Sequence, residues 1–117
     1  MEEIKNFERR RFPRLPFHEP VQYQLKDTHR FGGCLAGDIS EGGIRVNFND
    51  FIPLKTQIAV QVFLTLGRMV ECVGHVVWIQ KFPFSDRYQV GLAFLDGDSS
   101  AEAKKEIAQF VSHATSK

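Results

Sequence analysis

The chain has 117 residues, enough for one domain with one hydrophobic core. Hydrophobic residues make up 43% and charged residues 25%, an ordinary globular balance that excludes disorder as the main feature. The formal net charge of +1 disfavours a protein that grips long nucleic acid through many phosphates. Phenylalanine dominates the aromatic residues, with 11 Phe against 2 Tyr and 1 Trp, so we expect a dense aromatic core.

The sequence contains no feature of a membrane or secreted protein. No apolar run is long enough to cross a bilayer, and the N-terminus contains acidic residues and lacks the apolar core of a secretory signal peptide. Cys34 and Cys72 stand far apart, and neither belongs to a CxxC pair. We therefore expect a cytoplasmic protein with reduced thiols and no membrane insertion.

Residues 1–18 are expected to form a flexible basic arm. Residues 8–14 carry four positive charges and one negative charge. Pro13, Pro16 and Pro20 oppose helix and sheet hydrogen bonding and favour extended backbone. We place the boundary of the folded domain, residues 19–117, directly after this arm.

Apolar and polar residues alternate from Val21 onward, which is typical of half-buried strands. In the clearest case, Ile58, Val60 and Val62 share one strand face. A tight hairpin is expected at Gly67-Arg68. The alternation predicts six antiparallel strands, over residues 21–25, 31–39, 42–48, 57–66, 69–81 and 88–94.

A helix is expected to end the chain after a turn at Asp96-Gly97. Ser99 and Glu102 have the spacing of a capping box, with Ser99 as N-cap, and residues 100–114 follow as the helix. Its apolar stripe is expected to pack on the core: Ala103, Ile107, Phe110, Val111 and Ala114. Six strands in a small domain tend to close into a barrel, so the fold class is all-β, a six-stranded antiparallel β-barrel whose helix plugs one end or covers one side.

The arm holds the first group of residues that can bind a ligand. Arg10 and Arg14 form an RxxxR pattern, with Arg9 directly before it. Guanidinium groups pair with phosphate through two parallel hydrogen bonds, reach guanine O6 and N7, and stack on bases. In extended backbone, positions 10 and 14 point to the same side and Arg11 points to the opposite side. An RxxxR pattern alone is equally typical of a solvated basic tail.

The second group lies between the second and third predicted strands. Asp38 can accept hydrogen bonds from an arginine or from the N1–H and N2–H₂ edge of guanine. The Ser40 hydroxyl can donate to a phosphate, and Gly42 and Gly43 allow close approach of a ligand to the backbone. The same residues also fit an ordinary hairpin turn stabilised by side-chain hydrogen bonds.

Taken together, the two groups resemble the PilZ family of bacterial receptors for the second messenger cyclic di-GMP. The family pattern is RxxxR in an N-terminal arm followed by [D/N]xSxxG at the junction of the second and third strands. Here the RxxxR positions are Arg10 and Arg14, and the second motif is met by Asp38, Ser40 and Gly43. The resemblance covers roughly residues 8–97.

The resemblance implies a ligand and a role for each group. The family fold is a six-stranded β-barrel with a flanking helix, and the ligand lies on its outer surface under the arm. Arg10 and Arg14 would grip guanine edges and phosphates, while Asp38 and Ser40 would hold a guanine from the barrel side. Gly42 and Gly43, from the same turn, would leave space for the ligand.

Arg9 belongs to the main site, where it would add a phosphate contact. Four further residues are weaker candidates for the ligand site. Of these, Arg11 would add another phosphate contact, and Arg45 projects outward close by. Trp78 is either a stacking platform or a core residue, and its alternation with Val76 favours the core. Arg87 is either at the rim of the site or a solvated charge.

No enzyme is expected, because no nucleophile–base set is apparent and no histidine has metal-ligand spacing with a cysteine. The main hypothesis is a cyclic di-GMP sensor without a cofactor or metal, whose arm orders on binding and signals to a separate effector protein in motility, biofilm, exopolysaccharide or pilus control. The alternatives are a PilZ-like protein-interaction module without nucleotide binding and a small barrel that binds single-stranded nucleic acid. The sequence leaves open whether the protein is a monomer or a homodimer.

Overall fold

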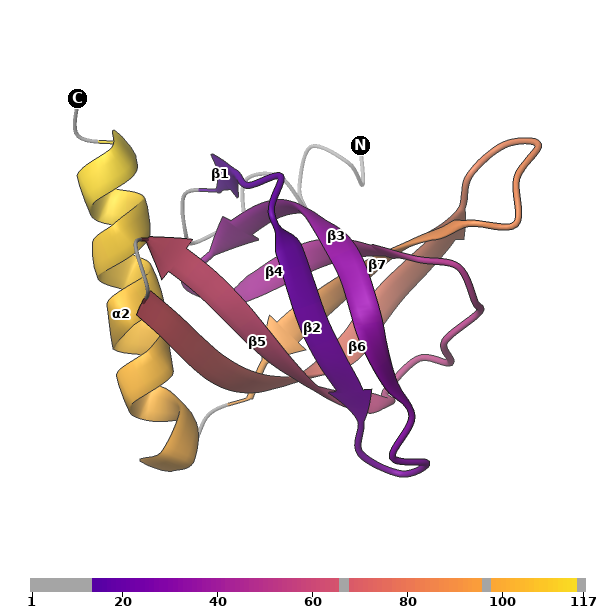
Figure 1. Ribbon diagram of the computed structural model, residues 1–117, viewed down its shortest axis with the longest axis horizontal. Coiled ribbons are helices and arrows are strands. Elements are labelled where there is room, and N and C mark those ends of the chain that lie inside the picture. The colour runs from indigo at the N-terminus through magenta and orange to yellow at the C-terminus, as the bar shows by residue number, and fades with distance from the viewer. Residues whose placement is uncertain (1–13, 66–67, 96–97, 116–117) are drawn as a thin grey trace, which may run out of the picture.

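The computed structural model describes residues 14–65, 68–95 and 98–115 of the chain. Within these ranges the chain forms a strand-rich fold with one long helix near its C-terminus (Figure 1). The elements are β1 (Leu15–Pro16), β2 (Pro20–Leu25), β3 (Phe31–Ser40), β4 (Gly43–Phe48), β5 (Gln57–Thr65), β6 (Arg68–Lys81), β7 (Tyr88–Phe94) and α2 (Asp98–Thr115). The six predicted strands and the predicted helix are present with ends within two residues of the expected ones. The helix begins at Asp98, so Ser99 lies in its first turn and not before it.

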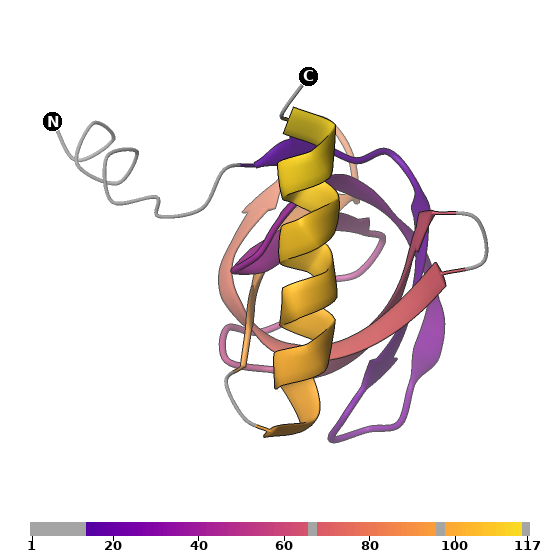
Figure 2. The same ribbon diagram turned by 90° about the vertical axis from the view of Figure 1, so that its left-hand side faces the viewer.

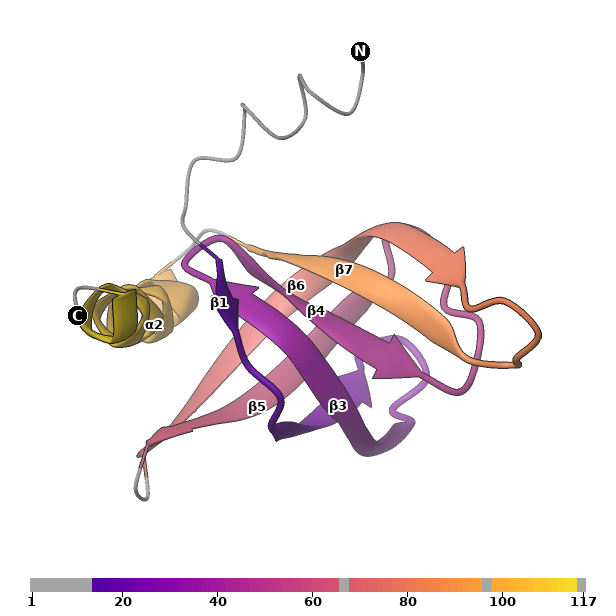
Figure 3. The same ribbon diagram turned by 90° about the horizontal axis from the view of Figure 1, so that it is seen from above.

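Strands β2 to β7 close into a six-stranded antiparallel barrel, which confirms the predicted fold class. The hydrogen-bonded order is β3, β2, β5, β6, β7 and β4, and β4 pairs back with β3. Closure leaves no free edge among the six strands, which explains how so many strands fit a small domain. The two-residue strand β1 adds to β3 beyond the end of β2, with Leu15 opposite Ile39 and Pro16 opposite Asp38 (Figure 3).

The core follows the predicted alternation, but aliphatic side chains fill it. Of the nine phenylalanines in the described ranges, only Phe17, Phe48 and Phe94 are buried. The expectation of a dense aromatic core was therefore wrong. The interior of a six-stranded barrel is narrow, and β-branched side chains fit its pleated inner surface. The largest side chains with almost no exposure are Ile39, Ile44, Ile52, Ile58, Ile107, Val21, Val46, Val60, Val62, Val76, Val90 and Cys72.

Helix α2 lies across one open end of the barrel (Figure 2). Ala103, Ile107 and Val111 are buried in the barrel core, as the predicted stripe requires. Phe110 is partly buried and meets Phe17 edge to face, with ring centroids 5.8 Å apart. The helix therefore closes the core at that end. Among the described residues, no helix is long and apolar enough to cross a membrane.

The described end of the predicted arm packs on the barrel. Leu15 and Pro16 pair with β3, and the Phe17 side chain is only 5% exposed. Extended backbone around Pro16 suits this pairing, and burial of Phe17 supplies the driving force that residues 14–18 need to stay in place. Residues 14–18, which the prediction assigned to the flexible arm, thus pack on the barrel.

Candidate functional site

A row of paired residues crosses four strands on the outer face of the barrel. Asp38 on β3 pairs with Arg45 on β4, and Arg45 pairs with Gly91 on β7. Gly91 in turn pairs with Trp78 on β6. Residues that pair directly in antiparallel strands project to the same face of the sheet, so these side chains form one line across the outer surface. Their chain neighbours point inward and are fully buried: Ile39, Ile44 and Val90.

Two β-bulges turn Asp38 and Trp78 outward. The pairing register shifts between Ala36 and Asp38 in β3, and again between Val76 and Trp78 in β6. The extra residue of a bulge reverses the alternation of side chains beyond it. Ala36 and Val76 are therefore buried, whereas Asp38 is partly open to solvent and Trp78 is 39% exposed. The prediction that Trp78 lies in the core beside Val76 was wrong for this reason.

The Trp78 indole stands over Gly91. A Cβ atom on Gly91 would lie 2.3 Å from the indole Nε1, far closer than real contacts allow. Because Gly91 has no side chain, the indole can lie directly over the backbone of β7. The indole thus occupies the outer face of β7 that Gly91 leaves low.

Asp38 is held between two arginines. Arg14 donates from Nε to Asp38 Oδ1 at 2.8 Å, and its Nη2 lies 2.6 Å from the same oxygen. Arg45 donates from Nε to Asp38 Oδ2 at 2.8 Å. Hydrogen bonds between ionised partners are the stronger kind, so each carboxylate oxygen holds one guanidinium in place. The three side chains together carry one net positive charge.

These residues line an open hollow of about 450 Å³ on the outer face of the barrel. We call it the basic–aromatic hollow; its lining is Arg14, Pro16, His18, Gly37, Asp38, Arg45 and Trp78. Guanidinium groups suit phosphates, an exposed indole suits a planar base, and a carboxylate accepts from N–H groups. The hollow can therefore bind a ligand that combines phosphate with an aromatic ring.

Ser40 and Gly43, the last two positions of the [D/N]xSxxG pattern, stabilise the turn between β3 and β4. Ser40 is only 2% exposed; its hydroxyl accepts from the Gly42 N–H at 3.2 Å and donates to the Gly43 carbonyl at 3.4 Å. A Cβ atom on Gly43 would lie 2.2 Å from the Leu92 carbonyl oxygen on β7. The space at Gly43 is thus taken by the neighbouring strand, and Ser40 belongs to the turn.

The remaining predicted site residues divide into two groups. Arg87 lies in the β6–β7 connection, where its guanidinium stands 5.7 Å from the centre of the Phe82 ring. It does not line the basic–aromatic hollow. The predicted arm residues Arg9, Arg10 and Arg11 lie outside the described residues.

Sequence reasoning missed His18 as part of the site. The signal was present, because His18 is the last residue of the predicted arm and directly follows the apolar Phe17. A buried Phe17 sends the side chain of its neighbour outward. Gly37 carried a comparable signal, since a glycine inside a strand pattern often marks a bulge.

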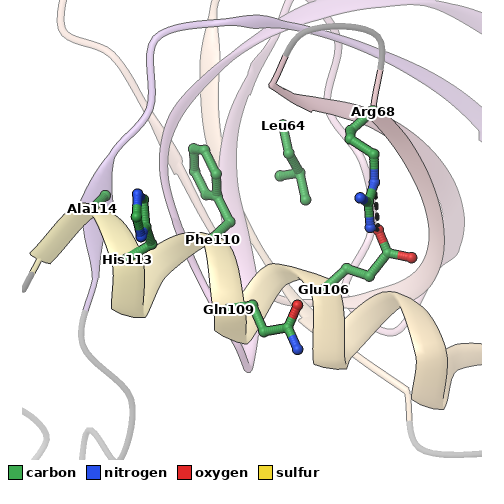
Figure 4. A pocket seen from close by; sticks show the side chains of 7 residues that line it. All are labelled: Leu64, Arg68, Glu106, Gln109, Phe110, His113 and Ala114. Carbon is green, nitrogen blue, oxygen red and sulfur yellow. Dashed lines mark hydrogen bonds and ion pairs between the residues drawn. The ribbon is translucent and has the colours of Figure 1, made fainter.

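A second hollow, of about 380 Å³, lies between α2 and the ends of β5 and β6 (Figure 4). Leu64 and Phe110 point into it, and Arg68 at its rim forms an ion pair with Glu106. This guanidinium faces a carboxylate from the helix, so it ties α2 to the barrel. The second hollow lacks the pair of arginines beside an indole that marks the first.

The described residues contain no group of His, Cys, Asp and Glu side chains placed to hold a metal ion. Both cysteines are free, and burial raises the pKa of Cys34 and of Cys72 to about 12. Thiols with so high a pKa remain protonated and unreactive at neutral pH.

The chain resembles one family in sequence and several solved structures in fold. The family model described as "PilZ domain" matches residues 8–113. The structure of the Bacillus subtilis inhibitor of motility MotI/DgrA shares 21% identity at a TM-score of 0.72, covering 93% of this chain and 53% of that one. The PilZ domain of Escherichia coli YcgR, solved with cyclic di-GMP, shares 16% identity at a TM-score of 0.67, covering 91% and 90%.

A third similar structure is the K. pneumonia MrkH complex with cyclic di-GMP, with 16% identity and a TM-score of 0.67, covering 88% of this chain and 51% of that one. The chain thus spans about half the length of MotI and of MrkH, and nearly the whole of the YcgR domain. No sequence match to a curated protein was found.

Proposed function

Because the chain belongs to the PilZ domain family, we propose that it is a receptor for cyclic di-GMP and binds it in the basic–aromatic hollow. One observation carries the proposal: two guanidinium groups, a carboxylate and the exposed indole meet in that hollow. The ligand of the YcgR and MrkH structures supports the same assignment. The chain is then a receptor and not an enzyme, and its unreactive free thiols fit a reducing compartment such as the cytoplasm.

The ligand combines two phosphates with two guanines, and the hollow offers a partner for each part. Arg14 and Arg45 can pair with phosphate through two parallel hydrogen bonds or reach guanine O6 and N7. Trp78 offers a flat surface on which a guanine can stack. Asp38 can accept from the guanine N1–H and N2–H₂ groups, which adenine lacks.

Binding requires Arg14 to exchange partners. An ionised carboxylate has about four acceptor sites. Arg14 uses Oδ1 of Asp38 with two nitrogens, and Arg45 uses Oδ2 with one. Only one site remains for the two donors of a guanine edge, so Arg14 leaves Asp38 and turns to the ligand. Asp38 thereby holds Arg14 ready beside the hollow until the ligand arrives.

The part of the arm that precedes Arg14 gives the receptor a way to signal. Arg9, Arg10 and Arg11 come shortly before Arg14 in the sequence, so we expect them to contact a ligand bound in the hollow. We expect ligand binding to order this arm over the barrel and to create a new surface for a separate effector protein. MotI is named as an inhibitor of motility, so motility control is one candidate pathway, beside biofilm formation.

Titration calorimetry with cyclic di-GMP tests the proposal on the wild type and on Arg14→Ala. We expect micromolar or tighter binding by the wild type. Loss of charge-assisted hydrogen bonds from Arg14 should weaken binding by about 10- to 100-fold, corresponding to roughly 1.5–3 kcal/mol.

Arg87→Ala is the matched control, because Arg87 is an exposed arginine outside the hollow; we expect its affinity to stay within about twofold of the wild type. Cyclic di-AMP serves as the ligand control for guanine recognition by Asp38. The proposal fails if the wild type releases no heat with cyclic di-GMP, or if Arg87→Ala weakens binding as much as Arg14→Ala does.

A further inference from the structure

His18 is fixed in the wall of the basic–aromatic hollow by its two chain neighbours. The Phe17 N–H donates to the Gly37 carbonyl at 3.1 Å, and the Ala36 N–H donates to the Glu19 carbonyl at 3.1 Å. The Phe17 side chain is buried against the helix. Because neighbouring side chains in extended backbone point to opposite sides, the imidazole of His18 is directed outward and lines the hollow.

The charged side chains that line the hollow around the imidazole carry less positive charge than the ligand carries negative charge. The charged side chains that share the hollow with His18 are Arg14 from the arm, Asp38 from β3 and Arg45 from β4. Trp78, from β6, is uncharged, and the adjacent Glu19 is exposed and does not line the hollow. These groups sum to one positive charge, whereas cyclic di-GMP carries two phosphate charges. A protonated His18 would add a positive charge beside the phosphates, next to those of Arg14, Arg45 and the arginines that precede Arg14.

We propose that His18 contacts a ligand phosphate and takes up a proton when the ligand binds, so that this chain senses cyclic di-GMP together with pH. The inference rests on the proposed function. Histidine is the side chain whose charge normally changes between pH 5 and pH 8. A phosphate beside the imidazole favours its protonated form, and by linkage the protonated form favours the phosphate.

The direction of the effect follows from this linkage. The ligand binds the protonated form more tightly, so affinity should be higher at pH 6 than at pH 8. Attraction between the imidazolium and a ligand phosphate in a partly hydrated site should change the affinity by about fivefold between pH 6 and pH 8. The added cation acts on the phosphates and leaves guanine recognition by Asp38 unchanged.

The test is calorimetry with cyclic di-GMP at pH 6, 7 and 8, repeated at pH 7 in buffers of low and high ionisation enthalpy to count the protons taken up. The variants are His18→Gln, which cannot be protonated, and His18→Lys, which keeps a positive charge over this range. The control is His29→Gln in the β2–β3 connection. Most of β3, roughly 20 Å of extended strand, separates His29 from Asp38.

We expect the wild type and His29→Gln to bind about fivefold more tightly at pH 6 than at pH 8 with net proton uptake. Both His18 variants should bind without proton uptake and with little change between the two pH values, and His18→Lys should be the tighter of the two. The inference is overturned if the wild type binds equally well at pH 6 and pH 8, or if His18→Gln keeps the pH dependence. Absence of binding at every pH would instead overturn the proposed function itself.

Discussion

Replacing Gly43 by alanine should destabilise the barrel, because the space beside Gly43 belongs to strand β7. The added Cβ would lie 2.2 Å from the Leu92 carbonyl oxygen, whereas ordinary contacts begin at 3.4 Å. Strands β4 and β7 must therefore part by about 1 Å at this point. That shift also strains the hydrogen bond from the Phe94 N–H to the Gly42 carbonyl, now 2.9 Å long.

The expected loss of stability is large for one methyl group. Overpacking in a tight core costs about 1–3 kcal/mol. A weakened backbone hydrogen bond adds about 1 kcal/mol, so the free energy of unfolding should fall by roughly 2–4 kcal/mol. For a domain of this size the change corresponds to a fall in Tm of about 10 °C. The change is a substantial share of the total stability of a typical domain.

Thermal and urea unfolding followed by circular dichroism measure this effect, with Gly33→Ala on β3 as the control. A Cβ on Gly33 would meet its nearest atom only at 3.9 Å, so this variant should unfold within about 0.5 kcal/mol of the wild type. The reasoning is refuted if Gly43→Ala is as stable as Gly33→Ala but no longer binds cyclic di-GMP. That result would mean that the glycine leaves space for the ligand and not for β7.

Three further outcomes follow from burial. Burial raises the pKa of Cys34 and Cys72 to about 12. Both thiols should therefore react slowly with a thiol reagent at pH 8 in the native protein and rapidly in urea. Fast labelling of the native protein would contradict their burial. The unfolded chain releases these protons first, so the free energy of unfolding should decline as the pH rises above about 9. Ser40→Ala removes the buried hydroxyl from the β3–β4 turn and should lower the free energy of unfolding by about 1–2 kcal/mol in urea titrations, while an unchanged midpoint would show that the turn does not need it.

The sequence allowed the barrel to be predicted because burial on one face of a strand leaves a period of two. Residues 57–65 illustrate this, since Ile58, Val60 and Val62 were expected to share an inner face and all three are fully buried. Closure followed from the number of strands and the size of the domain. Strand β1 was missed because two residues next to prolines leave no periodic pattern to recognise.

The bulges limited what could be predicted about the site. Asp38 was expected between two strands and lies near the end of β3, while Arg45 was expected to project outward nearby and lines the same hollow. Trp78 was expected in the core, because alternation with Val76 places it there unless one residue is inserted between them. The consecutive valines at 76 and 77 were the only trace of the bulge in the sequence. Contacts such as those of Arg14 with Asp38 join distant parts of the chain, and no local pattern encodes them.

The most direct test of cyclic di-GMP binding in the basic–aromatic hollow uses the fluorescence of Trp78. It is the only tryptophan in the chain and lies partly exposed in the hollow, so its emission reports on that site alone. Titration with cyclic di-GMP should quench the emission in a saturable way as a guanine stacks on the indole, and the same titration with Arg14→Ala should need at least about tenfold more ligand. Calorimetric binding that leaves the Trp78 emission unchanged would contradict the account, because the ligand would then bind elsewhere.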